Sequence, residues 1–260
     1  MQNNSTWAPS VPSPIDWPRE AWNPWFTALA FVGGLVVFVV AQTAYVLLAA
    51  KFHTIDPNHL TQLSVTQTLI VEFVSWGSIA VYFLLVLPYA LHVPLSALGF
   101  RAPTAFDLNF AVVGAFAMFV IVNGTGTVTT ALSHRHDTEA ALALLHQLHT
   151  PLERAGFVVL ACGVAPFCEE LTFRAFLFSA LSRYFPFGVA LVVSGALFGA
   201  LHATDSWPGE LLTVGLPLAL GGMLLAYVYA KTRCFWANVI THALFNAVGV
   251  VGVMVFHVSS

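Results

Sequence analysis

The sequence predicts an all-α protein, a polytopic transmembrane helical bundle of seven to eight spans. Its composition is the first reason: 58% of the 260 residues are hydrophobic and 8% are charged, whereas about 25% charged residues are typical of soluble domains. The second reason is that the apolar residues fall in blocks about as long as the roughly 20 residues that a helix needs to cross a bilayer. We therefore expect a polar N-terminal tail over residues 1–24 and a single integral membrane domain over residues 25–260.

Seven apolar blocks follow the tail, and each predicts a helix in the bilayer. The first is too long for the core of a signal peptide and lacks a convincing cleavage site, so it predicts an uncleaved span. The last also fits a span followed by a partial helix, which gives the eighth. The blocks are residues 25–50, 68–93, 108–133, 155–181, 188–203, 210–231 and 235–258.

The loops and charges give the expected surroundings. Residues 134–154 mix charges, four histidines and an apolar run, which predicts a short amphipathic helix at the membrane surface. Lysine and arginine are more frequent in the loops on the side of the N-terminus, which favours a cytoplasmic N-terminus. We also expect a plasma (inner) membrane location. The net charge of −3 argues against nucleic acid as a partner, which leaves the lipid bilayer and a membrane substrate.

Three charges lie in the middle of the fourth block, within residues 168–174 (CEELTFR). A charged side chain near the centre of a bilayer costs at least about 2.5–3.5 kcal/mol, so these charges need partners and indicate a functional site. Helical spacing places Glu170 and Arg174 one turn apart, where they can pair, while Glu169 points about 100° away. We expect Glu170 and Arg174 to support the site and Glu169 to do chemistry. Pro166 predicts a break or kink just before Glu169.

Two further polar pairs lie in the late blocks. Phe198 and His202, and likewise His242 and Asn246, are four residues apart, which stacks each pair on one helix face. Glycines three and seven residues before His202 would let another helix approach it closely. By contrast, Glu72 near the start of the second block is expected to snorkel or pair rather than act in catalysis.

The combined set suits hydrolysis of an amide. Glu169 with His202 can hold and deprotonate a water molecule, and His242 and Asn246 can donate hydrogen bonds to the oxyanion. A rival assignment makes Glu169, His202 and His242 ligands of Zn²⁺ carrying the same water. There is no His-Glu-x-x-His pair, so no cofactor is certain and zinc stays an alternative. No Gly-x-Ser-x-Gly elbow is present either.

Glu-Glu-x-x-x-Arg at 169–174, Phe-x-x-x-His at 198–202 and His-x-x-x-Asn at 242–246 resemble the three ordered motifs of the CAAX prenyl protease 2 and bacteriocin-processing (Abi, or CPBP) family of intramembrane proteases. The resemblance covers about residues 155–250, the expected catalytic core, and residues 98–101 (LGFR) are similar to a loop often found upstream in the family. It implies a CAAX protease 2-like helical fold and an endopeptidase with the residue roles given above. The family has been described both as metalloproteases and as metal-independent glutamate proteases, and both stay open here.

The predicted function is hydrolysis of a peptide bond in a membrane-associated or prenylated-type peptide or protein. Two alternatives use the same buried polar groups: a transporter or proton-relay protein, and a non-catalytic immunity or scaffold protein. A transporter would be expected to carry its substrate site between repeated halves. No convincing internal repeat is present, and the polar groups gather in the C-terminal half of the chain.

Overall fold

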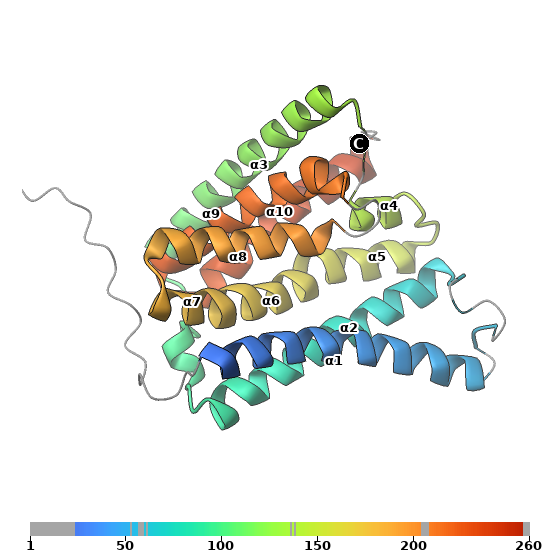
Figure 1. Cartoon of the computed structure of the whole chain (residues 1–260). Helices are drawn as coiled ribbons and strands as arrows, with labels where there is room; N and C mark the ends of the chain where they lie inside the picture. The colour runs from blue at the N-terminus through green and yellow to red at the C-terminus, as the bar shows by residue number, and fades with distance from the viewer. Residues whose placement is uncertain are drawn as a thin grey trace, which may run out of the picture.

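The computed structural model describes residues 24–52, 54–56, 60, 62–135, 137, 139–203 and 208–256. The tail predicted for residues 1–24 lies outside this part of the chain, apart from its last residue. Across the described residues the chain is helical, and no strand is formed. The all-α membrane bundle is therefore confirmed (Figure 1).

Six helices are long and apolar enough to cross a membrane. They are α1 (Pro24–Lys51), α2 (Val65–Leu85) with its extension η2 (Val86–Ala90), α3 (Ala105–Ser133), the composite helix Pro151–Tyr184, η6 (Leu211–Gly215) with α9 (Leu216–Thr232), and α10 (Phe235–Phe256). The remaining predicted span forms the 16-residue α8 (Phe187–His202). A helix of that length is about 24 Å long, shorter than the roughly 30 Å hydrocarbon core. All seven apolar blocks thus form helices.

The fourth span is a composite helix. It runs through α5 (Pro151–Val159), the π-helical η4 (Leu160–Val164), α6 (Ala165–Glu169), the π-helical η5 (Glu170–Phe178) and α7 (Ser179–Tyr184). Figure 1 shows these segments in one row through the middle of the molecule. The break expected at Pro166 is replaced by the wide turn η4, because a turn with i→i+5 hydrogen bonds accommodates a residue that has no N–H to donate.

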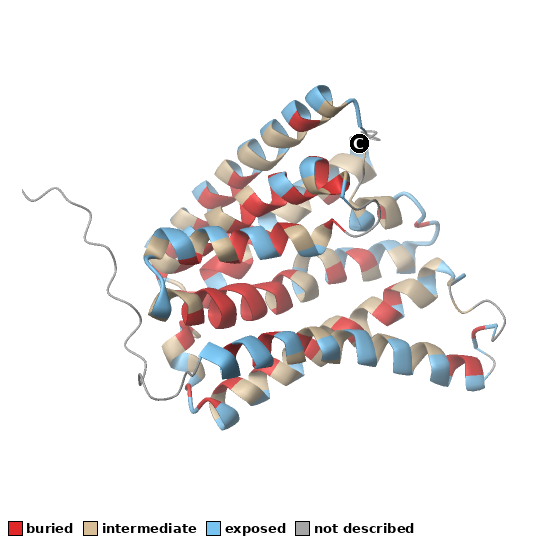
Figure 2. Ribbon diagram, in the orientation of Figure 1, coloured by how far each residue is buried: buried red, intermediate tan, exposed pale blue. Residues whose placement is uncertain are grey.

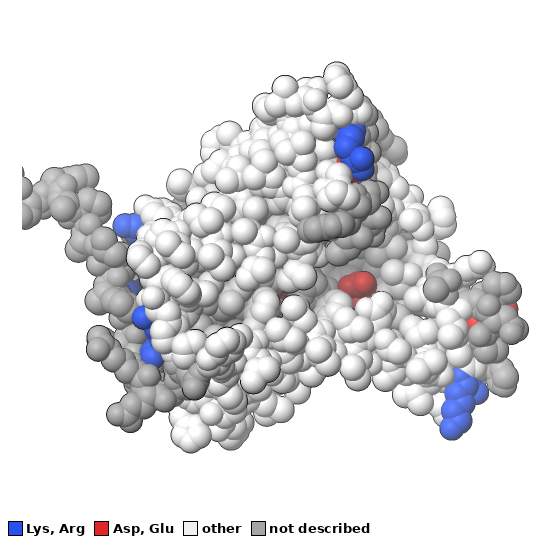
Figure 3. All heavy atoms as spheres, in the orientation of Figure 1, with Lys and Arg blue, Asp and Glu red and all other residues white. Residues whose placement is uncertain are grey.

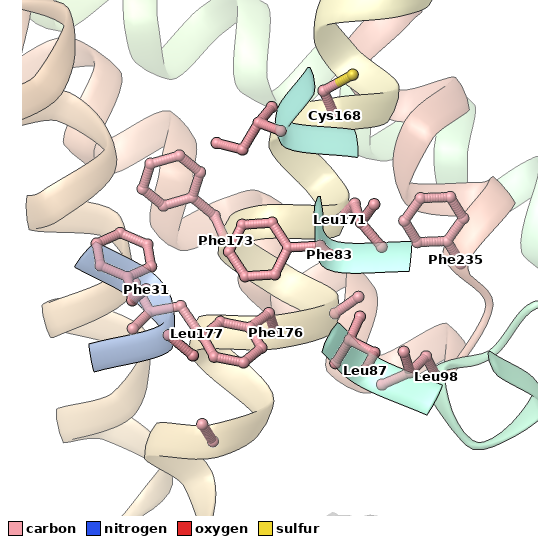
Figure 4. Close-up of a cluster of buried hydrophobic side chains, with 14 of the residues drawn as sticks. Phe31, Phe83, Leu87, Leu98, Cys168, Leu171, Phe173, Phe176, Leu177 and Phe235 are labelled. Carbon is pink, nitrogen blue, oxygen red and sulfur yellow. The ribbon is translucent and has the colours of Figure 1, made fainter. Parts of the chain in front are cut away.

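This helix is the centre of the bundle. Every residue of η5 is buried, and η5 contacts α1, α2, α8, α9 and α10, so Figure 2 shows it as a continuous red segment. On one side its aromatic and aliphatic side chains pack against α1 and α2; Phe173 meets Phe31 with ring centroids 5.9 Å apart, and Phe176 meets Phe83 at 4.8 Å (Figure 4). The charged residues of the fourth span are thereby shielded from lipid by protein.

Two glycines bring α8 against its neighbour, as their spacing before His202 predicted. A Cβ atom on Gly195 would lie 2.7 Å from the Ala219 carbonyl oxygen, and one on Gly199 would lie 2.6 Å from the Ala219 amide nitrogen and closer still to the carbonyl of Gly215. No side chain fits at either position. His202, at the end of α8, is therefore fixed relative to η6 and α9.

The segments around the spans are short. Residues 134–154 were expected to form a short surface helix, and the described part holds the six-residue α4 (Ala140–Leu145). The end of this range is already the first turn of α5, because Thr150 caps that helix and starts the fourth span at Pro151. The upstream loop at 98–101 docks on the start of α10: Gly99, with φ 77°, accepts a hydrogen bond from the Phe235 amide at 2.9 Å. The Arg101 guanidinium bridges Asp107 and the Thr232 carbonyl.

Candidate active site

Glu170 is fully buried and is held by side chains from two helices. Arg174, one turn later, donates to Oε1 at 3.1 Å, which is the predicted ion pair. From α10, Asn238 donates to Oε2 and the Nδ1 atom of His242 lies 2.8 Å from Oε1. Arg174 also donates to the Gly222 carbonyl at 3.2 Å, which ties the pair to α9. Glu170 thus joins the fourth span to α10.

Glu169 faces two imidazoles without a direct hydrogen bond to either. Its Oε1 atom lies 4.0 Å from Nε2 of His202, and its Oε2 atom lies 3.6 Å from Nε2 of His242. The residue is 5% exposed, and Oε2 has no hydrogen-bond partner. Separations of this size between buried polar atoms suit a bridging water molecule. The structure therefore brings Glu169, His202 and His242 together from three helices.

The second nitrogen of each imidazole is already engaged. Nδ1 of His202 lies 2.7 Å from the Phe198 carbonyl oxygen. A carbonyl only accepts, so Nδ1 carries the proton, and in the neutral ring Nε2 is then an acceptor directed at Glu169. Nδ1 of His242 faces the Glu170 carboxylate in the same way. Both rings consequently present Nε2 to Glu169.

Phe198 forms an apolar wall for this group. Its ring centroid lies 4.5 Å from that of His202 and 5.9 Å from that of His242. The Arg174 guanidinium carbon lies 4.4 Å from the same ring, within the range of a cation–π contact. Phe198 therefore limits the motion of both imidazoles and of the arginine.

Asn246 lies one turn beyond His242 on α10 and is bonded to the fourth span. One of its amide N–H groups donates to the Ala161 carbonyl at 2.7 Å. Ala161 is in the π-helical η4, where the irregular turn leaves a carbonyl available for a side chain. This bond uses one of the two N–H groups of the Asn246 amide, so the other can donate to a second acceptor.

Sequence reasoning missed Asn238. The signal was present, since Asn238, His242 and Asn246 follow one another at four-residue spacing and form a polar stripe on one face of α10. The first member of the stripe contacts Glu170, and the last contacts Ala161. The whole stripe therefore faces the fourth span.

The proposed zinc ligands have suitable donor types, two imidazole nitrogens and a carboxylate. Among the residues that the structure describes, however, no group of three or more His, Cys, Asp or Glu side chains is arranged to hold a metal ion. Glu169, His202 and His242, with separations of 4.0 and 3.6 Å, are not among such groups.

Residues 151–248 match the family model described as Type II CAAX prenyl endopeptidase Rce1-like. This segment is therefore similar to that family. The match contains every motif residue from Glu169 to Asn246, so the resemblance to the CAAX prenyl protease 2 family is confirmed for this part of the chain. The matched segment comprises the composite fourth span, α8, α9 and most of α10.

Three relatives match the chain over parts of their length. They are a Bacillus subtilis protein named putative membrane peptidase YdiL, 30% identical over 34% of this chain and 34% of that protein; the Lactococcus lactis UPF0177 protein YxdF, 29% identical over 33% and 44%; and an uncharacterized Mycoplasma capricolum protein, 29% identical over 36% and 26%. The alignments thus span less than half of each relative. No solved structure matches the chain.

Proposed function

We propose that the protein is an intramembrane endopeptidase that hydrolyses a peptide bond in a membrane-associated or prenylated-type substrate. The observation that carries the proposal is the buried Glu169 carboxylate, which faces the Nε2 atoms of His202 and His242 at 4.0 and 3.6 Å. Both Nδ1 atoms are engaged elsewhere. An Rce1-like family match over the same residues supports a protease.

Water activation follows from the two acceptors. A water molecule between Glu169 and His202 donates one hydrogen to the carboxylate and the other to Nε2 of the neutral imidazole. Its lone pair then points away from both and toward a substrate carbonyl carbon. As the oxygen attacks, Glu169 accepts the proton as general base. When the C–N bond breaks, Glu169 returns this proton to the leaving nitrogen, which yields a carboxylic acid and an amine.

The oxyanion needs donors on the side of the carbonyl oxygen. The second N–H of Asn246 is one donor. His242 can donate through Nε2 only when both ring nitrogens carry protons, because Nδ1 is directed at Glu170. Each such donor contributes about 3–4 kcal/mol of transition-state stabilisation in comparable sites. Glu170, Arg174 and Phe198 have a supporting role, since they orient His242.

The substrate is expected to reach the site from the bilayer. The reactive group lies in the centre of the fourth span, which is one of six membrane-length helices in the described part of the chain. We propose a lipid-embedded peptide or protein, lipidated or not, as the partner, and a multi-pass location in the plasma (inner) membrane with the N-terminus in the cytoplasm.

The test is a cleavage assay with the purified protein in lipid nanodiscs, with membrane-peptide libraries as substrates and mass spectrometry as readout. Glu169→Ala and His202→Ala should each abolish cleavage while the protein still inserts and folds. Glu139→Ala and His134→Ala, which change the same residue types in the loop after α3, are the matched controls and should cleave normally. Full activity of either active-site variant would refute the proposal.

A further inference from the structure

Glu72 is a carboxylate on the membrane-spanning α2 that the proposed reaction does not use. It is half-buried, and the Trp76 side chain, one turn later, donates a hydrogen bond to it. The same turn of α2 contacts the active-site helix, since the Cys168 thiol donates to the Trp76 carbonyl at 3.2 Å. Glu72 is therefore one helical turn from a contact made by the residue before Glu169.

The charge of Glu72 is not balanced within the described part of the chain. No lysine, arginine or histidine there forms an ion pair with it. The buried guanidinium of Arg174 is bound to Glu170 and to the Gly222 carbonyl. The carboxylate of Glu169 acts on Glu72 and repels it. An intramembrane carboxylate without a cation is costly, and one that persists marks a functional position.

Few charged atoms are visible on one face of the molecule. Figure 3 shows acidic atoms in a hollow near the middle of a face that is almost wholly white. Two carboxylates of the same sign that act on each other, Glu72 and Glu169, concentrate a negative potential that attracts a cation. A charged N–H donor also forms a stronger hydrogen bond with a carboxylate than a neutral amide does.

We propose that Glu72 is a specificity-determining residue that binds the side chain of a lysine or arginine in the peptide substrate, next to the bond held at Glu169. The inference rests on the proposed function, because it places this cationic side chain beside the scissile bond. The substrate cation supplies the positive charge that the described part of the chain does not place on Glu72.

The experiment measures binding separately from cleavage. The probes are fluorescent 20-residue peptides of leucine, alanine and glycine, acetylated and amidated at their ends, with lysine, arginine, norleucine or glutamate at the central position. Binding to the protein in nanodiscs is measured in a Glu169→Gln background to prevent turnover. The lysine and arginine peptides should bind about tenfold more tightly than the norleucine peptide, as one charge-assisted contact allows.

The matched variants assign the preference. Glu72→Gln should remove it, Glu72→Asp should keep part of it, and Glu139→Gln, a half-buried carboxylate outside the site, should leave it intact. Equal binding of the lysine and norleucine peptides when Glu72 is present, or a preference that survives Glu72→Gln, would overturn the inference. A Glu72-dependent preference without any cleavage by the wild-type protein would support the inference and refute the proposed protease function. Cleavage with no charge preference would refute the inference alone.

Discussion

The Nδ1 atom of His242 lies 2.8 Å from Oε1 of Glu170, while its Nε2 atom lies 3.6 Å from Oε2 of Glu169. Two consecutive carboxylates of one helix therefore face the two nitrogens of one imidazole. Because Glu170 is itself held by Arg174 and Asn238, the ring orientation is set by residues that do not reach the proposed water position. This arrangement separates residues that position the site from those that react.

Asn238 is expected to be a positioning residue. Asn238→Ala removes the hydrogen bond to the buried Oε2 of Glu170 and should lower stability by about 1–3 kcal/mol. We expect kcat to fall with little change in KM, because His242 loses its fixed partner while the substrate surface is retained. Asn123→Ala, which removes an asparagine bonded only within α3, is the control. Equal kcat in the two variants would contradict this role.

Arg174 should be required for folding through the buried pair. Both side chains of the Arg174–Glu170 pair are fully buried, and removal of one member of such a pair typically costs about 3–5 kcal/mol. Arg174→Leu should therefore lower the midpoint of thermal unfolding in detergent strongly. The double change Arg174→Leu with Glu170→Leu should recover part of this loss, since no buried charge is left alone. An unchanged midpoint in the single variant would disprove the requirement.

The contact of α8 with its neighbour should depend on Gly199. A methyl group there would clash with the backbone of Ala219 and Gly215, which cannot move aside as a side chain can. Gly199→Ala should destabilise the protein by about 1–3 kcal/mol and should displace His202, so cleavage should fall as well. Gly188→Ala in the same helix, where a Cβ meets no atom within 4 Å, should behave as wild type. Similar melting of the two variants would count against close packing at Gly199.

The distances from Glu169 to the Nε2 atoms of His202 and His242 predict how cleavage responds to removal of metal. Water held between Glu169 and His202 needs no ion to be deprotonated, so chelators should leave the rate of cleavage unchanged. The measurement is cleavage with and without a chelator, beside quantification of metal in the purified protein. Loss of activity that Zn²⁺ restores would instead assign Glu169, His202 and His242 as ligands.

Hydropathy predicted the helices well because the bilayer sets their length. The third predicted block, 108–133, corresponds to α3 at Ala105–Ser133, and the block at 188–203 corresponds to α8 at Phe187–His202. The errors in the predicted helix boundaries fall at the helix ends, where capping residues decide the first residue. With Thr150 as its cap, the fourth span starts four residues before the predicted position. Helical spacing likewise predicted the Glu170–Arg174 pair, which is local in sequence.

Contacts between distant segments were harder to predict. The three motifs indicated that polar groups converge, but they do not encode that Nδ1 of His242 faces Glu170 or that Asn238 joins them. Glu72 was expected to snorkel or pair. Its relation to Glu169 could not be predicted, because that relation depends on how α2 packs against the fourth span. The π-helical turns were also not predicted, since the sequence indicated only an irregularity at Pro166.

The wide turn at Leu160–Val164 has a consequence for the phase of the fourth span. A π-turn contains one residue more than the α-helical turn it replaces, so it rotates all later residues by about 100° relative to a regular helix. Deletion of a single residue there would preserve the hydropathy and every motif yet turn Glu169 away from both imidazoles. Homologues that have the three motifs but lack this extra residue would therefore be expected not to assemble the active site.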